Sequence, residues 1–405
     1  AEDGTLGLAA ASCAKDGRYF AYAAAASGSD WVEIRVKDTA TGELTTDKIN
    51  WVKNSGAEWA PDSKGFYYSG YEAPDGSVYS SQNQYQKVYY HALGTPQSVD
   101  RLVYEDREHP LRYFWAWPSE DGKWLFVLAS EGTSGTEVLY RRSSEKQFRT
   151  LLKGFDADYA PVTVKDDALY YVTNRDAMNY ALCRIDLNSP KRIETVIPEH
   201  ETTLLEGVSS VGGYLFASYL ENAQDKIVQF DFDGRRVRDV QLPAIGTVGG
   251  FSGDDETTEL YYTLTNYTAP ATVYHYDIAS AESTLYNAPE VNLEPEHFVT
   301  EQVLYPSKHD TRVPMFITHR KDMKLDGKNP CLLYGYGGFQ INLTPGFNPS
   351  ALMFVEQGGI YCVANLRGGS EYGEAWHRAG MLEKKQNVFD DFIAAAEYLI
   401  AGKYT

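Results

Sequence analysis

The feature that most constrains the fold is a short two-strand pattern that returns from the start of the chain to about residue 295. Each copy has a turn containing Asp or Gly, an alternating aromatic and β-branched strand, a polar gap and a second strand. The first strands lie at Tyr19–Tyr22, Phe66–Tyr68, Trp124–Val127, Leu169–Val172, Tyr214–Phe216 and Leu260–Tyr262. The second strands lie at Val32–Val36, Val88–Tyr90, Val138–Tyr140, Leu182–Ile185, Ile227–Phe230 and Val273–Tyr276. About six copies at a spacing of roughly 45 residues are typical of four-stranded β-propeller blades.

Two other all-β folds compete with the propeller, namely a β-sandwich array and a parallel β-helix. A β-helix has a much shorter repeat, and a sandwich does not usually repeat the Asp-Gly turn so regularly. The first copy begins almost at the first residue, and the set has no evident closing partner. We therefore expect about one further blade upstream of Ala1.

The pattern changes near Pro295. Two strands at 299–305 and 313–319 predict a hairpin, and they precede a strand from Cys331, a helix over 350–357, a buried strand over 359–365 and a helix over 387–400. In the last helix Asn387 is the expected N-cap and Gly402 the expected stop. Its apolar residues share one face at helical spacing: Val388, Phe389, Phe392, Ile393, Ala396, Leu399 and Ile400.

A hairpin followed by alternating strands and helices is how an α/β-hydrolase sheet begins. The predicted architecture is therefore an all-β propeller over residues 1–295, lacking its start, followed by the first part of an α/β-hydrolase catalytic domain over residues 296–405. The chain ends before a fifth strand of that sheet would form.

The stretch Cys331–Phe339 is the most informative part of the second domain. An apolar run, read as a buried strand, breaks into Tyr336 between glycines. Glycine permits positive φ, and in an open α/β sheet ligands bind at the carboxyl ends of the strands. A phenol at this place can donate to an oxyanion. An ordinary tight turn explains the motif equally well when it is considered alone.

The serine nucleophile motif G-x-S-x-G does not occur in the sequence. Ser252 and Ser370 are its nearest misses, and both are interpreted as turn residues. Arg367 and Glu371 are expected to form a partly buried ion pair that pins a glycine-rich loop, in preference to touching substrate. The eight histidines show no metal-binding spacing, so no metal or cofactor is predicted.

Charge and cysteine content restrict the partners. The formal net charge of −19 repels nucleic acids and anionic membranes, and we predict neither as a partner. The four widely spaced cysteines are expected to be buried free thiols, ahead of disulfides or metal ligands. The first residues have no signal-peptide pattern, which leaves the compartment of this soluble protein open between cytoplasm and periplasm.

Three segments resemble the prolyl oligopeptidase family of serine peptidases. They are 333–339 (Leu-Tyr-Gly-Tyr-Gly-Gly-Phe), 367–377 (Arg-Gly-Gly-Ser-Glu-Tyr-Gly-Glu-Ala-Trp-His) and 385–391 (Lys-Gln-Asn-Val-Phe-Asp-Asp). The similarity extends over essentially the whole chain. The Tyr-Gly-Tyr-Gly-Gly-Phe form looks like the proline-specific branch, not the related branch that cuts after basic residues.

The resemblance implies a seven-bladed propeller joined to an α/β-hydrolase domain that cleaves short peptides after proline. It implies that Tyr336 supplies an oxyanion-hole hydroxyl and that Phe339 lines the pocket for the substrate proline. More weakly, Arg175 resembles a propeller arginine that faces the substrate. The family's Ser-Asp-His triad would lie beyond Thr405, so the chain is expected to be an internal portion that is inactive alone.

The implied partners are short proline-containing peptides and the remainder of the catalytic domain, in a protein that is monomeric when complete. The alternative is a non-catalytic propeller that binds peptides or proteins, with residues 296–405 as a vestigial extension. Tyr336 discriminates between the two, because a binding module has no need of an oxyanion phenol on a glycine-rich loop.

Overall fold

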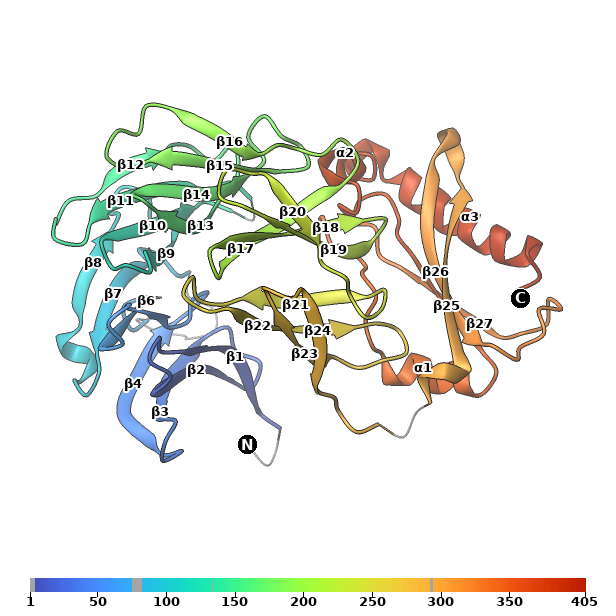
Figure 1. Cartoon of the computed structure of the whole chain (residues 1–405), viewed down its shortest axis with the longest axis horizontal. Coiled ribbons are helices and arrows are strands. Elements are labelled where there is room, and N and C mark those ends of the chain that lie inside the picture. The colour runs from blue at the N-terminus through green and yellow to red at the C-terminus, as the bar shows by residue number, and fades with distance from the viewer. Residues whose placement is uncertain (1–3, 75–81, 133, 292–293) are drawn as a thin grey trace. The chain divides into compact units, whose positions relative to one another are not determined.

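The structure is a computed structural model that describes residues 4–74, 82–132, 134–291 and 294–405. The chain forms two compact units, the first made of Ala1–Thr173 and Ile185–Arg192 and the second of Asn174–Arg184 and Ile193–Thr405. The expected domain boundary after residue 295 falls inside the second unit and stays a prediction. Figure 1 labels the elements along the chain.

The first unit begins with an eight-stranded sheet in the order β1-β2-β3-β4-β6-β7-β8, with β5 paired to β6. Its strands are β1 (Leu6–Cys13), β2 (Tyr19–Ala26), β3 (Val32–Asp38), β4 (Leu44–Val52), β5 (Glu58–Trp59), β6 (Gly65–Gly70), β7 (Lys87–Ala92) and β8 (Arg101–Glu105). A short 3₁₀ helix, η1 (Gln97–Val99), precedes β8. The two halves of this sheet are joined where Val52 of β4 pairs with Gly70 of β6.

A four-stranded sheet and a hairpin follow in the first unit. The sheet has the order β12-β11-β10-β9 and is formed by β9 (Tyr113–Pro118), β10 (Trp124–Ser130), β11 (Glu137–Arg142) and β12 (Arg149–Leu152). In the hairpin, β13 (Tyr159–Lys165) pairs with β14 (Ala168–Thr173). The chain continues through β15 (Ala181–Asp186) and β16 (Ile193–Ile197).

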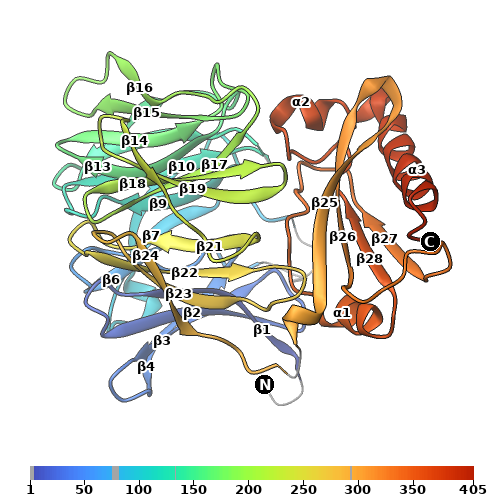
Figure 2. The same cartoon turned by 45° about the vertical axis from the view of Figure 1, so that its right-hand side comes forward.

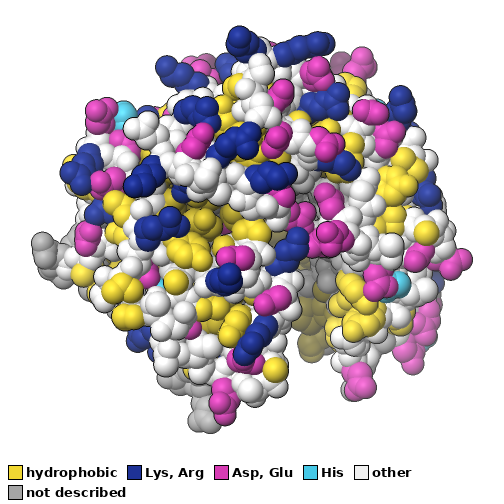
Figure 3. All heavy atoms as spheres, turned by 60° about the vertical axis from the view of Figure 1, so that its left-hand side comes forward, with side chains coloured by type: hydrophobic (Ala, Val, Ile, Leu, Met, Phe, Trp, Pro, Cys, Tyr) yellow, Lys and Arg dark blue, Asp and Glu magenta, His cyan; other side chains and the backbone are white. Residues whose placement is uncertain are grey.

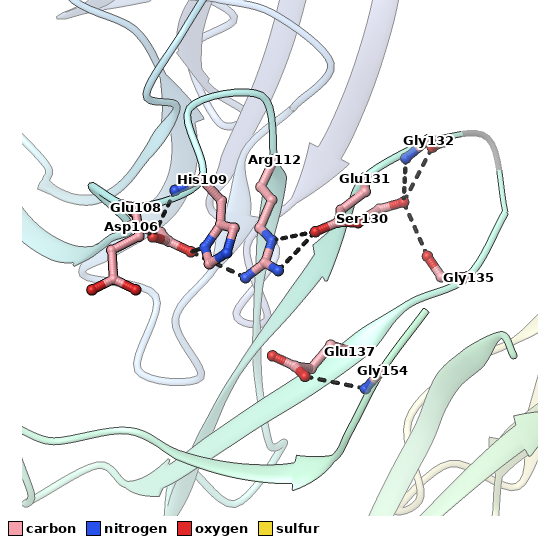
Figure 4. A network of polar contacts seen from close by, with 10 residues as sticks. All are labelled: Asp106, Glu108, His109, Arg112, Ser130, Glu131, Gly132, Gly135, Glu137 and Gly154. Atoms are coloured by element: carbon pink, nitrogen blue, oxygen red, sulfur yellow. Dashed lines mark hydrogen bonds and ion pairs between the residues drawn. The ribbon is translucent and has the colours of Figure 1, made fainter. Parts of the chain in front are cut away.

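A network of ion pairs fastens the segment that leads into β9 (Figure 4). The Arg112 guanidinium donates to Asp106 at 3.2 Å and to Glu131 at 2.7 Å, and it stacks over the Phe155 ring at 4.9 Å. His109 donates to the same Asp106 carboxylate at 2.9 Å. One arginine thus links the turn before β9 to the end of β10 and to the chain after β12.

The second unit contains two more antiparallel four-stranded sheets that run in sequence order. The first is formed by β17 (Leu204–Val211), β18 (Tyr214–Glu221), β19 (Gln224–Phe230) and β20 (Arg236–Asp239). The second is formed by β21 (Thr247–Ser252), β22 (Glu259–Thr265), β23 (Thr272–Asp277) and β24 (Glu282–Asn287). Every strand of the predicted two-strand copies is confirmed, and each copy is the central pair of a larger group.

The last sheet has the order β25-β26-β28-β27, and β27 runs parallel to β28. Its strands are β25 (Phe298–Pro306), β26 (Arg312–Arg320), β27 (Cys331–Gly335) and β28 (Ile360–Ala364). The α-helices are α1 (Pro349–Glu356), α2 (Gly373–Arg378) and α3 (Gln386–Ala401), and the 3₁₀ helices are η2 (Pro295–His297), η3 (Lys308–Asp310) and η4 (Leu382–Lys384). The predicted hairpin, strands and two long helices are confirmed, whereas α2 was not predicted.

The helices α1 and α3 lie on opposite faces of this sheet (Figure 2). Alternate residues of a strand point to opposite faces. Met315 and Ile317 of β26 accordingly pack with Leu399 of α3, whereas Phe316 packs against Tyr267 from the loop after β22. Both faces of β26 and β28 are therefore covered, and β28 is the buried strand that the sequence predicted.

Two expectations for this part of the chain are wrong in detail. The strand β27 is an edge strand, and Leu332 and Tyr334 on one of its faces are 48% and 46% exposed. Asn387 is not the N-cap of α3, since Lys385 holds that position and the Asn387 amide donates to the Ala379 carbonyl. Gly402 is the C-cap as expected.

The predicted apolar face of α3 is only partly buried. Val388 and Leu399 are buried, but Phe389 and Ile393 are each 54% exposed. The buried face of α3 is rotated relative to the predicted apolar face, and it includes Asp391, a carboxylate that lies at the centre of the site described below.

All four cysteines are free; Cys183 and Cys362 are buried as expected, whereas Cys13 is exposed. Across the described ranges, no helix has the combined length and apolar character needed to cross a bilayer. Figure 3 shows cationic and anionic side chains interspersed over the face in view.

Candidate active site

Two loops meet at the carboxyl ends of the parallel strands β27 and β28. We call residues 336–343, which follow β27, the tyrosine loop, and residues 365–374, which follow β28, the glycine loop. The register pairs Gly335 with Ala364, so the two loops leave the sheet side by side. Both predicted site residues of this domain, Tyr336 and Phe339, lie on the tyrosine loop.

The two aromatic side chains of the tyrosine loop are accessible and adjacent. Tyr336 is 43% exposed and Phe339 is 83% exposed, and their ring centroids are 6.5 Å apart. In the described part of the chain, no hydrogen bond reaches the Tyr336 hydroxyl. The loop therefore presents one free O–H donor beside one uncovered apolar ring.

The backbone of the tyrosine loop is strained at its tip. Phe339 and Gln340 have φ values of 53° and 59°, a region that residues with a Cβ rarely adopt. Such strain costs on the order of 1–3 kcal/mol per residue and persists only where surrounding contacts hold it. The contacts that do so come from the glycine loop and from α3.

Close packing of the backbone explains the glycines. Gly337 has a φ of 62°, and a Cβ there would collide with the Val388 side chain and lie 2.9 Å from the Arg367 carbonyl oxygen. A Cβ on Gly368 would lie 2.6 Å from the Gly337 carbonyl oxygen. Glycine at both positions lets the two loops touch through their main chains.

Side chains then fasten the loops to each other. The Ser370 hydroxyl donates to the Gln340 carbonyl at 2.9 Å, and its backbone N–H donates to the Asn342 side chain at 2.9 Å. The Asn365 amide donates to the Leu343 carbonyl at 2.7 Å. Ser370 is thus a loop-fastening residue, in agreement with its interpretation as a turn serine.

Glu371 takes part in this fastening but not in the predicted ion pair with Arg367. Its carboxylate accepts from the Leu343 N–H at 3.1 Å and from the Asn365 amide at 3.3 Å. Burial raises the pKa of the Glu371 carboxyl above its ordinary value. The prediction of an Arg367–Glu371 ion pair is wrong, because Arg367 pairs with a different carboxylate.

That carboxylate is Asp391 of α3. The Arg367 guanidinium donates to it through two nitrogens at 2.9 and 2.6 Å, and the Arg367 backbone N–H adds a third bond at 3.1 Å. The side chains of Arg367 and Asp391 are 5% and 0% exposed. A bidentate, water-excluded pair of this kind fixes the glycine loop to α3.

Lys385 reaches the tyrosine loop directly. Its ammonium donates to the Gly337 carbonyl at 2.6 Å, one residue beyond Tyr336. Neither Lys385 nor Asp391 was among the predicted site residues. The signal available in the sequence was Asp391 itself, because a charged residue on the buried stripe of a helix requires a partner.

Arg175 lies in the segment between β14 and β15, which belongs to the same compact unit as the two loops. The side chain is exposed. A neighbouring residue of this segment, Asn179, sits so close to the glycine loop that a Cβ on Gly373 would collide with its side-chain oxygen. The structure thus brings the Arg175 segment to the end of the glycine loop, while the predicted role of Arg175 stays a prediction.

The fold and the site together define a class of protein. A set of propeller-type sheets precedes a sheet that opens like an α/β-hydrolase, and a rigid loop at its strand ends carries an exposed hydroxyl donor. Residues 1–289 match the family model described as prolyl oligopeptidase, N-terminal β-propeller domain, and residues 345–405 match the prolyl oligopeptidase family. The chain belongs to the prolyl oligopeptidase family.

Particular relatives agree with this. The chain is 40% identical to a prolyl endopeptidase of Elizabethkingia meningoseptica over 406 residues, covering 100% of the chain and 57% of the relative. It is 33% identical to a dual function macrocyclase-peptidase of Galerina marginata over 430 residues, covering 100% of the chain and 59% of the relative. The chain therefore spans less than three fifths of the length of these relatives.

Solved structures show the same likeness. A structure from a study of two prolyl endopeptidases superimposes with a TM-score of 0.92 at 40% identity, covering 100% of this chain and 60% of that one. Prolyl oligopeptidase B of Galerina marginata, bound to a 25-residue macrocyclization substrate, gives 0.91 at 32% identity, covering 100% and 59%. The predicted fold class, a propeller followed by the first part of an α/β-hydrolase domain, is confirmed.

Proposed function

We propose that the protein to which this chain belongs is a serine endopeptidase that cleaves short peptides on the carboxyl side of proline. Catalysis proceeds by acyl transfer through a Ser-Asp-His triad that lies outside this chain. The observation that carries the proposal is the Tyr336 hydroxyl, an accessible donor that no described residue accepts from, on a loop that two other segments hold in place. Family membership and relatives named prolyl endopeptidase support the proposal.

In this proposal Tyr336 acts on the tetrahedral intermediate. Attack of the serine oxygen on the carbonyl carbon places a negative charge on the carbonyl oxygen, and the Tyr336 O–H donates a hydrogen bond to that oxygen. The donor helps most if it needs no reorganisation as the charge develops. The bonds from Lys385 and the glycine loop to the tyrosine loop meet that requirement.

Phe339 and Arg175 have binding roles in the proposal. The exposed Phe339 ring packs against the pyrrolidine ring of the substrate proline, an apolar contact beside the oxyanion donor. Arg175 faces the substrate from the propeller and donates to peptide carbonyl oxygens. The proposed partner of the chain itself is the remainder of the catalytic domain, which would cover apolar side chains such as Leu332 on β27 and Ile400 on α3.

The test is Tyr336→Phe in the full-length protein, with hydrolysis of a succinyl-Gly-Pro anilide as the assay. Loss of one oxyanion donor lowers kcat by about 10²–10³, with a smaller effect on KM. Tyr334→Phe is the matched control, because it removes a phenol from the adjoining strand and should leave kcat unchanged. Unchanged turnover in the Tyr336 variant would refute the oxyanion role.

A second measurement separates the peptidase from a non-catalytic binding module. A fluorophosphonate probe labels an activated serine, and mass spectrometry of the full-length protein then locates the label. A labelled serine outside this chain is expected. A full-length protein that takes no label would favour the binding module.

A further inference from the structure

A cavity in the first unit lies far in sequence from the candidate active site and is independent of the proposed function. Its volume is about 270 Å³, and it is bordered by β1, β5 and β9, three strands that contact one another in series. For scale, an engineered protein cavity of about 150 Å³ binds benzene. Protein interiors rarely leave such a volume empty without a reason.

The cavity exists because its floor is built from the smallest side chains. These residues come from β1, β2 and the turn before β5, and they are Ala10, Ala11, Ser12, Ala21, Ala23, Ser55, Gly56 and Ala57. Four aromatic residues, Tyr22, Tyr67, Tyr68 and Trp115, also line it. The floor therefore offers methyl groups, and the rings offer π faces that attract cations.

Most polar groups of the wall are already occupied. The Ser12 hydroxyl donates to the Ala57 carbonyl at 2.7 Å, and the Ser55 hydroxyl accepts from the Ser69 N–H at 2.9 Å. The Trp115 indole N–H donates to the Asn54 carbonyl at 3.0 Å. These groups hold the wall in place and have little capacity left for a ligand.

Glu58 is the exception. Its side chain lines the cavity, and over residues 4–74, 82–132, 134–291 and 294–405 no hydrogen bond or ion pair reaches its carboxyl group. Glu58 is accessible to solvent, yet enough protein surrounds it that desolvation raises its pKa to about 7. The other titratable groups of the lining are the phenols of Tyr22, Tyr67 and Tyr68.

We propose that this cavity binds a primary alkylammonium group, with the ammonium on the Glu58 carboxylate and the alkyl part against the alanine floor. Glu58 is the one carboxyl group among the described lining residues, and its ionised form disfavours anionic ligands and favours a cation that can donate hydrogen bonds. An ammonium has three donors, whereas a guanidinium has five. With one carboxylate among the described lining residues, the guanidinium would leave more donors unpaired.

Calorimetric titration of the intact chain with n-butylammonium chloride tests the proposal. Saturable binding is expected, and Glu58→Gln should weaken it at least about tenfold, since a charge-assisted hydrogen bond is lost. Glu43→Gln is the matched control, an exposed carboxylate on the turn before β4 that should leave the affinity unchanged. Circular dichroism confirms that each variant is folded.

A second variant and two further probes sharpen the result. Ala57→Leu keeps the carboxylate but fills the cavity, and it should also abolish binding. Alaninamide and Nα-acetyl-lysinamide distinguish a peptide N-terminus from a lysine side chain as the source of the ammonium, and acetyl-alaninamide should not bind. Equal binding to the Glu58→Gln variant, stronger binding of n-butylguanidinium, or no saturable binding to the unmodified chain would each overturn the proposal.

Discussion

His91 offers the sharpest test of the electrostatics of the first unit. Its side chain is 0% exposed and lies between two carboxylates that are each 2% exposed. The ring nitrogens are 2.7 Å from Asp100 and 2.9 Å from Asp47. Because Asp47 belongs to β4 and His91 to β7, the cluster ties together the two halves of the eight-stranded sheet, whose ladders are joined through the Val52 and Gly70 pair.

The magnitude follows from the shifted pKa of His91. Burial alone would lower this pKa, but the hydrogen bonds to Asp100 and Asp47 outweigh burial and raise it from 6.5 to about 9. Because the folded-state pKa lies above the unfolded value, the stabilisation is fully present below pH 6.5 and is lost as the pH rises through 9. The shift corresponds to about 3 kcal/mol at pH 6, about 1.4 kcal/mol at pH 8 and almost nothing by about pH 9.5.

The perturbation is His91→Gln, which removes the cation and leaves two buried carboxylates. Loss of one partner from a buried ion pair costs about 3–5 kcal/mol. The assay is amide hydrogen exchange of peptides from β4 and β7, corrected for the intrinsic rate at each pH. The free energy of local opening should fall between pH 6 and pH 9.5 in the unmodified chain but not in the variant.

Two further variants make this result decisive. His275→Gln, on β23 in the other unit, should leave exchange in β4 and β7 unchanged. The triple variant His91→Gln, Asp47→Asn, Asp100→Asn removes all three charges and should restore protection with no pH dependence across the same range. If His91→Gln keeps the pH dependence of the unmodified chain, a charged His91 is not what joins the two halves of the sheet.

Two other predictions concern the candidate active site. In the full-length protein, Lys385→Met should lower kcat about tenfold with little change in KM. The reason is that the Gly337 carbonyl loses its donor, so that the loop carrying the oxyanion hydroxyl is less well placed. Lys385→Arg should recover part of the rate, and equal effects on kcat and KM would contradict a positioning role. Arg367→Met should destabilise the chain by about 3–5 kcal/mol in thermal or chemical unfolding, because it leaves the buried Asp391 carboxylate without its cation. The double variant Arg367→Met, Asp391→Leu should recover most of this loss. A double variant as unstable as the single one would refute this account.

The sequence determined the fold class because strand period and turn chemistry are local properties. Alternating aromatic and β-branched residues between Asp-Gly turns located the central strands of the sheets, such as β2 and β10. The first and fourth strands of each group escaped notice. Edge strands such as β24, in which Leu285 and Tyr286 are exposed, lack the alternation that burial on one face imposes.

The position of Tyr336 was likewise local information, since an apolar run followed by glycines predicts a loop at a strand's carboxyl end. The pairing of the charged residues was not local information. Arg367 and Glu371 are near in sequence, yet Arg367 pairs with Asp391, 24 residues away, and Glu371 accepts from the tyrosine loop.

Only the tertiary structure decided which buried charge meets which partner, because a desolvated carboxylate is satisfied by whatever donor the fold brings within hydrogen-bond distance. Glu58 and His91 likewise owe their surroundings to the tertiary structure, because nothing in their local sequence distinguishes them. The local sequence alone determined where the central strands and the turns lie. The packing of strands from distant copies decided that Glu58 lines a cavity, where no described residue bonds to its carboxyl group, and that His91 is enclosed between two carboxylates.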